Sequence, residues 1–290
     1  MSIVKLNTLP CPTFTWLGVN DTTADAAAPV SESVSPGGTV QISESAALEV
    51  SAQGGEKRSA VMFISPKESA HITTKVTAQG GSHVTLVQVF DGSKRTVSKV
   101  EAAIGDDAEF QLVQLYLKTA DTISEVDVRL DGTRAQLDTS IGYLLGGSDR
   151  LDINLIARHF GRKTRSQITA KGVMQGSAEK TFKGTIDFVN GCSGALGEEI
   201  EDVLLIGEKV VNKTVPLILC AEENVEGSHG ASIGRVDEEH IFYMLSRGLP
   251  EDEIVRLMAQ SKIAQIVGRI ADEQVRGRIN DIIGRGIENE

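Results

Sequence analysis

The chain has 290 residues, 40% of them hydrophobic and 4% aromatic, and its formal net charge at pH 7 is −11. This length and apolar content allow one large domain, or one domain with a smaller appendage, and exclude a disordered chain. The negative charge argues against a dedicated binder of nucleic acid or of anionic membranes, because such binders need Lys and Arg to neutralise phosphates.

Targeting and redox signals indicate a cytoplasmic protein. The first residues do not combine a basic segment with an apolar run, so no secretory signal is expected. No apolar run is long enough to span a bilayer. The three cysteines, Cys11, Cys192 and Cys220, are far apart and odd in number, which favours a reducing compartment over a disulfide framework.

Residues 1–38 are predicted to form an irregular N-terminal arm. Its second half, residues 21–38, is small, polar and interrupted by prolines, as is typical of a loop or linker. We expect Phe14, Trp16 and Leu17 to anchor this arm to the rest of the protein.

Residues 39–234 are predicted to form a β-rich core. Alternation of apolar and polar residues predicts strands at 71–78, 83–90, 109–117, 122–130, 136–145, 150–160, 166–174 and 183–189. Turn-forming sequences such as Gln79-Gly80-Gly81 separate these runs, and no helical segment intervenes. The spacing is compatible with a sandwich, a barrel or a β-solenoid, and the lack of a clean repeat counts against the solenoid on pattern alone.

Residues 235–290 are predicted to form a helical domain. Asp237 is placed to cap a first helix, Gly248 to end it, and Pro250 to begin a second helix. Apolar residues then recur at helical spacing: Ile254, Leu257, Met258, Ile263, Ile266, Val267 and Ile270, followed by Val275, Ile279, Ile282, Ile283 and Ile287. These faces could pack on the protein's own core or dock another chain, and both uses stay open.

A basic segment interrupts the acidic chain between residues 156 and 183. It holds Arg158, Arg162, Lys163, Arg165, Lys171, Lys180 and Lys183 against one acid, Glu179. We interpret it as a solvated face, with a patch for an acidic partner as the alternative.

Metal-binding chemistry has scattered candidates. The sequence contains no Walker A, C-x-x-C or H-E-x-x-H pattern, so neither ATP hydrolysis nor a self-contained zinc site is expected. Thiolate and imidazole suit iron and iron–sulfur clusters. A cluster usually takes four ligands, so one chain has too few ligands for a complete cluster. The candidate side chains are Cys192, Cys220, His159, His229 and His240.

Sequence neighbours suggest how exposed these candidates are. Cys220 lies in an apolar run and is expected in the core, whereas Cys192 lies in a glycine-rich loop and is less clearly core. His159, in the basic segment, is expected at the surface. His229 lies between glycines just after the last predicted strand, where small neighbours would leave its imidazole accessible.

Residues 201–254 resemble the C-terminal core of the SufB/SufD family of iron–sulfur cluster assembly proteins. The residues that carry the resemblance are Leu204-Leu205-Ile206-Gly207, Pro216, Ser228-His229-Gly230-Ala231, Gly234, Phe242-Tyr243 and Arg247-Gly248. The resemblance implies a right-handed parallel β-helix with a C-terminal α-helical domain. It also implies a SufC-type ABC ATPase partner, which hydrolyses ATP, and a cysteine desulfurase system that takes part indirectly.

The resemblance further implies that two such chains, a SufB-type subunit with this one or a homodimer, pair through their last coils. A transient Fe–S cluster would form at that interface, and none would be bound tightly by the isolated chain. His229 matches a candidate cluster ligand, and Phe242, Tyr243, Arg247 and Gly248 match the segment that docks the ATPase.

Two departures favour a SufD-like, non-catalytic scaffold over a SufB-like one. Gly227 stands where SufD proteins can carry cysteine, and Glu201 stands where SufB proteins carry an important cysteine. A carboxylate can bind iron but is a harder ligand than thiolate. The metal-ligand candidates are therefore His229, Cys220, Cys192 and Glu201.

Two alternatives remain at this point. The chain could be a homodimeric, minimal SufB-like scaffold that binds the nascent cluster itself through Cys192 or Cys220. It could also be a carbohydrate-active β-solenoid enzyme, which the low aromatic content disfavours because such enzymes stack sugars on aromatic rings.

Overall fold

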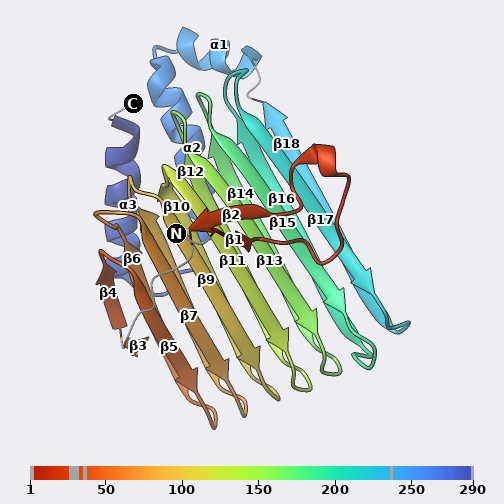
Figure 1. The fold of residues 1–290 in the computed structure, drawn as a ribbon. Helices are drawn as coiled ribbons and strands as arrows, with labels where there is room; N and C mark the ends of the chain where they lie inside the picture. Colours follow the sequence, from red (N-terminus) through yellow and green to blue (C-terminus); the bar gives the residue numbers. More distant parts are fainter. Residues whose placement is uncertain (1–2, 26–32, 35–37, 236–237, 289–290) are drawn as a thin grey trace.

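The strands alternate between two parallel sheets, and each pair of successive strands makes one coil of a β-solenoid (Figure 1). The computed structural model describes residues 3–25, 33–34, 38–235 and 238–288. This architecture confirms the predicted mainly β fold, with a parallel β-helix body and a helical C-terminal part. It selects the solenoid from the three architectures that the strand spacing allowed.

We name the two sheets by what covers their outer faces. The helix-covered sheet consists of β4 (Gly38–Ile42), β6 (Lys57–Ile64), β8 (His83–Asp91), β10 (Glu109–Lys118), β12 (Gln136–Leu145), β14 (Arg165–Met174), β16 (Ala195–Leu205) and β18 (Val225–Arg235). The arm-covered sheet consists of β3 (Ser33–Val34), β5 (Ala46–Ala52), β7 (Ala70–Ala78), β9 (Thr96–Ile104), β11 (Asp121–Leu130), β13 (Arg150–His159), β15 (Glu179–Phe188) and β17 (Val211–Cys220).

The coils differ in length, which explains why the sequence has no visible repeat. Lys57 pairs with His83, and His83 pairs with Glu109, so each of these two coils contains 26 residues. Arg165 pairs with Leu196, so that later coil contains 31 residues. Extra residues are absorbed in the turns, because the side-chain alternation holds the strands in register.

The turns at one end of the coils stack on one another. In three successive turns a residue with positive φ, namely Asp107, Arg134 or Lys163, donates its backbone N–H to a carbonyl of the next coil. Gly161 lies in this stack, where a Cβ atom would overlap the carbonyl group of Gly132. The turn-forming sequences therefore end the strands because they allow these conformations and close contacts.

Three helices follow the solenoid: α1 (Glu238–Ser246), α2 (Glu251–Val267) and α3 (Glu273–Glu288). The predicted cap Asp237 and the side chain of His240 lie outside the described residues. None of the described helices is long and apolar enough to cross a membrane.

Helices α2 and α3 cover the outer face of the helix-covered sheet (Figure 1). Their side chains form one buried cluster with those of β6, β8 and β10: Val61, Phe63, Val87, Val89, Val113, Leu115, Leu117, Ile263, Ile266, Val267, Ile270, Val275, Ile279, Ile282 and Ile283. Burial of this apolar area is what holds the two helices on the sheet. The sequence left open whether the apolar helix faces pack on the protein's own core or dock another chain. Those of α2 and α3 pack on the core.

The N-terminal arm crosses the outer face of the other sheet (Figure 1). It contains an antiparallel pair, β1 (Ile3–Leu6) and β2 (Thr22–Asp25), and a 3₁₀ turn, η1 (Thr15–Leu17). The prediction that aromatic side chains anchor the arm is wrong, because Phe14 and Trp16 are 73% and 80% exposed. Leu9 and Val19 are buried instead, and the side-chain amide of Asn7 donates to Asp152 on β13 at 2.7 Å.

The basic segment is not one solvated face. Lys180 is 1% exposed because it points into the coil, and Lys183 is fully buried because the arm covers it. The Lys183 ammonium donates to the backbone oxygen of Asn7 at 3.1 Å and lies 2.8 Å from Asp152.

His159 is also buried, contrary to the surface position expected for it. Its two ring nitrogens lie 2.7 Å and 2.9 Å from the hydroxyl groups of Thr164 and Ser166. Burial lowers the pKa of His159 to about 4, so the imidazole is neutral and structural at neutral pH.

Candidate functional site at the open end of the solenoid

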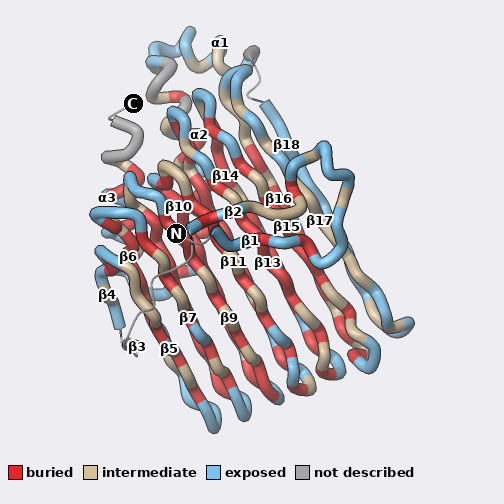
Figure 2. The backbone as a smooth tube through the Cα atoms, viewed as in Figure 1, coloured by how far each residue is buried: buried red, intermediate tan, exposed pale blue. Residues whose placement is uncertain are grey.

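The last coil leaves two long strand edges unpaired within the described part of the chain. β17 and β18 are the terminal strands of their sheets, with 10 and 11 residues respectively. Figure 2 shows that β18 is exposed along almost its whole length and β17 is mostly half-buried, whereas the strands of the preceding coils are largely buried. We call this surface the open end. A long unpaired edge offers backbone N–H and C=O groups to another strand.

His229 lies within β18, not after the last strand as expected. The segment has four small residues around His229 and no apolar alternation, so its sequence carries no strand signal; backbone pairing with β16 makes it a strand. A Cβ atom on Gly227 would contact Phe188 and Ile218 of the core. His229, two residues later, shares this inward-facing side of β18 and is exposed because no further coil covers it.

Glu201, the carboxylate expected as a metal ligand, lies inside the coil and is fully engaged. One oxygen accepts a hydrogen bond from the Tyr143 hydroxyl at 3.0 Å and pairs with the Lys180 ammonium. The other oxygen accepts a hydrogen bond from the Thr214 hydroxyl at 2.6 Å. Such pairing is the condition under which a charge can be buried.

Glu199 is a buried carboxylate that sequence reasoning missed. It lies on β16 two residues before Glu201, on the same inward side, and is 2% exposed. Its Oε2 atom has no hydrogen-bond partner among the described residues. Its carboxylate lies against Gly184, where any Cβ atom would overlap it. Burial, and then the charge of Glu201, raise the pKa of Glu199 to about 8.

The burial of Glu199 was not predicted because it lies in a charged run, residues 198–202, and such runs are usually exposed to solvent. The signal that could have revealed it is the alternation Gly197, Glu199, Glu201, Val203 on one side of a strand that enters the core.

We expect stability to fall as the pH rises from about 4.5 to about 8, because over this range the unfolded chain loses the Glu199 proton and the folded chain still holds it. Its folded-state pKa is raised, so the folded chain holds this proton to a higher pH than the unfolded chain does, and ionisation weakens the fold. Glu199→Gln removes this effect. Its Tm should fall several degrees less than that of the wild type between pH 5 and pH 9, measured by circular dichroism. Equal falls in Tm would contradict the assignment, and Glu198→Gln, on the outer face, is the matched control.

The two cysteines of the last coils have the reverse of their expected environments. Cys192 is fully buried in a turn that the last coil covers, and burial, with the nearby charge of Glu222, raises the pKa of its thiol. Cys220 is exposed at the end of β17, where its thiol donates to the backbone oxygen of Glu222 at 3.1 Å. The apolar run before Cys220 is not core because the solenoid ends there.

Helix α1 and the two residues that follow it contain the four residues expected to bind a partner. Phe242 is 74% exposed, and Tyr243 is also exposed, with the Arg247 guanidinium 5.2 Å from its ring centroid. Gly248 has a φ of 90°, which ends the helix as its sequence position predicts. α1 therefore differs from α2 and α3, whose apolar side chains are largely buried.

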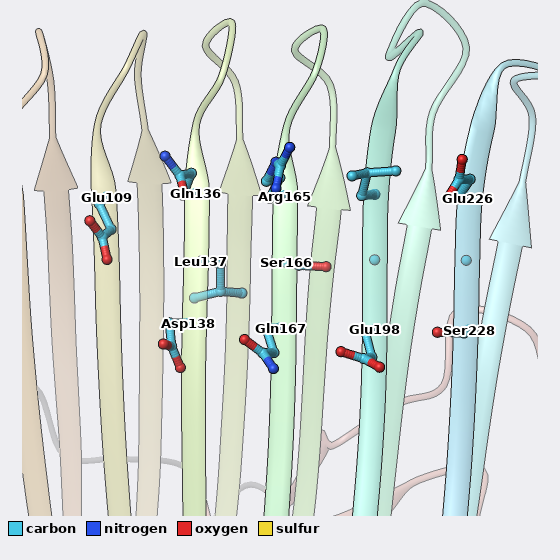
Figure 3. Close-up of a pocket in the computed structure, with 13 residues that line it drawn as sticks. Glu109, Gln136, Leu137, Asp138, Arg165, Ser166, Gln167, Glu198, Glu226 and Ser228 are labelled. Atoms are coloured by element: carbon cyan, nitrogen blue, oxygen red, sulfur yellow. The ribbon is translucent and has the colours of Figure 1, made fainter. Parts of the chain in front are cut away.

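A polar groove of about 570 Å³ lies on the outer face of the helix-covered sheet (Figure 3). Register partners from four neighbouring strands, Asp138, Gln167, Glu198 and Ser228, form a row across it. The residues predicted as metal ligands do not line this groove. It lies on the opposite side of β16 and β18 from the inward-facing site.

The open end thus brings His229 and the two glutamates onto neighbouring strands, and it places Cys220 on the last strand of the other sheet. Within the described residues, no three His, Cys, Asp or Glu side chains are close enough to hold a metal ion. The site by itself is an incomplete set of ligands beside two free strand edges.

A family profile decides the relationship of this chain to known proteins. The profile of the SUF system FeS cluster assembly, SufBD core domain, matches residues 39–262. The chain belongs to this family. The matched SufBD core includes every coil from β4 onward and most of α2.

Individual relatives agree with the SufBD assignment. The iron-sulfur cluster assembly protein SufD of Bacillus subtilis is 29% identical over 79% of this chain. An iron-sulfur cluster assembly SufBD family protein of Mycobacterium tuberculosis is 26% identical over 71%. The chain spans 53% and 55% of these two relatives, about half of their length.

Proposed function

We propose that this SufBD-family chain is a SufD-like, non-catalytic scaffold subunit of a cytoplasmic SUF-type complex that assembles iron–sulfur clusters. A role in iron–sulfur cluster assembly is supported by the match of residues 39–262 to the SufBD core and by the similarity to SufD. The observation that carries the scaffold role is the open end, where two long strand edges lie beside exposed His229.

In this proposal the three parts of the chain have separate roles. The core, residues 39–234, pairs through β17 and β18 with a SufB-type subunit or with a second copy of itself. Exposed apolar side chains on these edges, Val211 at 42% and Ile233 at 50%, would be buried on pairing. The arm, residues 1–38, braces the opposite sheet.

The helical part, residues 235–290, would dock a SufC-type ABC ATPase through α1. Phe242 and Tyr243 support this role, because large exposed aromatic side chains are enriched where protein partners bind. The cluster would form transiently between the paired chains, with iron and sulfur as cargo and His229 as one ligand. Sulfur would come indirectly from a cysteine desulfurase system.

The test of this proposal replaces His229 by Ala in a complex reconstituted with SufB-type and SufC-type partners. His229 is exposed, so the variant should fold with unchanged Tm. Cluster formation, followed anaerobically by visible absorbance after addition of iron and a sulfur source, should be strongly reduced because a ligand is missing. His83→Ala, on β8, is the control. Wild-type assembly by the His229 variant would count against this site.

A further inference from the structure

We infer that Glu199 and His229 together form half of a binding site for a divalent cation, ferrous iron, at the open end of the solenoid. The inference rests on the proposed function for the identity of the cation. It adds a carboxylate donor that the sequence motif does not contain.

Strand register places the two side chains next to each other. Glu199 on β16 and His229 on β18 are direct partners in the parallel ladder, where neighbouring strands lie about 4.8 Å apart. Figure 3 shows their sequence neighbours Glu198 and Ser228 on the outer face of the same two strands. Because side chains alternate along a strand, Glu199 and His229 both lie on the inward side.

The hydrogen bonding of the two buried carboxylates distinguishes Glu199 from Glu201. Lys180, Tyr143 and Thr214 satisfy Glu201 and neutralise its charge. Glu199 has a buried oxygen without a hydrogen-bond partner in the described structure. A buried polar atom left unpaired is unfavourable, and a cation at this position would satisfy it.

The donor types suit ferrous iron. Imidazole and carboxylate are both ligands of first-row divalent metals, and one of each leaves further coordination positions open. Within the described residues no third ligand is close, so the remaining positions would be filled by water or by the paired chain. His229 at the exposed mouth and Glu199 just beneath it would let the cation enter where the partner approaches.

Cobalt(II) is a suitable probe, because its visible absorption reports coordination by nitrogen and oxygen. The purified full chain should bind Co²⁺ saturably, at one site, under anaerobic conditions at about pH 8.5, because a carboxyl group must be deprotonated to bind a cation and burial raises the pKa of Glu199 to about 8. Glu199→Gln and His229→Ala should each weaken this binding about ten-fold or more, since both remove a direct ligand. Ferrous iron should displace the bound Co²⁺.

Two control variants separate the site from general charge effects. Glu198→Gln makes the same change on the outer face, and His83→Ala removes a histidine from a distant coil; both should bind Co²⁺ as the wild type does. Tm values confirm that each variant is folded. The inference is overturned if the wild type shows no saturable binding, if Glu199→Gln binds like the wild type, or if ferrous iron does not compete.

The experiment uses the chain without partners, so its result is independent of complex formation. Co-purification with SufB-type and SufC-type proteins tests the proposed function separately. Loss of Co²⁺ binding in Glu199→Gln with intact co-purification would be the expected pattern. Normal Co²⁺ binding without any co-purification would overturn the proposed complex and keep the cation site.

Discussion

Replacing Lys180 by Met is expected to destabilise the protein by about 3–5 kcal/mol, the usual effect of removing one partner from a buried ion pair. Lys180 is 1% exposed, and its ammonium is the cation that pairs with Glu201 inside the coil. Without it, Glu201 would keep only its hydrogen bonds from Tyr143 and Thr214, and Glu199 would lose the positive charge that lowers its pKa. The midpoint of guanidinium unfolding, followed by circular dichroism, measures the change.

A second variant shows whether the loss comes from the unpaired charge. Lys180→Met combined with Glu201→Gln removes both charges, and the amide keeps an oxygen that accepts from one hydroxyl group and an NH2 group that can donate to the other, so the double variant should recover part of the lost stability. Lys75→Met, on the exposed side of β7, is the matched control and should change the midpoint little. A double variant no more stable than Lys180→Met would contradict the ion-pair explanation.

Replacing Phe242 by Asp is expected to weaken binding of a SufC-type ATPase about ten-fold or more, because an aromatic side chain at the centre of an interface contributes strongly to affinity. Phe242 is 74% exposed on α1, so the substitution should leave the fold and the Tm unchanged. Co-purification and calorimetric titration with the ATPase measure the effect.

Point substitution is preferable to truncation in this experiment. Removal of the residues after Arg235 would uncover the apolar face that α2 and α3 bury on β6, β8 and β10, and the truncated chain should aggregate. Ile3→Asp, at a residue 73% exposed on β1, is the matched control for an apolar-to-charged change away from α1. ATPase affinity that is equal for Phe242→Asp and the wild type would contradict docking on α1.

Local patterns predicted the regular part of the fold well. Alternation along segments such as 109–117 and 136–145 corresponds to β10 and β12, and the stop at Gly248 corresponds to the end of α1. These features depend on neighbouring residues, so sequence alone contains them. β18 was not predicted as a strand, because its backbone pairing with β16, 30 residues earlier at Gly197 and Gly227, has no local signal.

Burial at the open end depended on where the coils stop. The same local sequence is core when another coil covers it and surface when none does, which is why Cys220 is exposed and Cys192 is buried. Lys180 is buried for the complementary reason, since its strand is covered and Glu201 faces it across the coil.

The sequence by itself determined the β-rich body, the helical end and the motif around His229, because strand alternation, helical spacing and short motifs are local properties. Only the tertiary structure decided that α2 and α3 cover the sheet, that the solenoid ends at β17 and β18, and that Glu199 lies beside His229. Those outcomes depend on register between residues about one coil apart, and the coils vary in length. The adjacent positions of Glu199 and His229 therefore follow from strand pairing, not from any pattern in the chain.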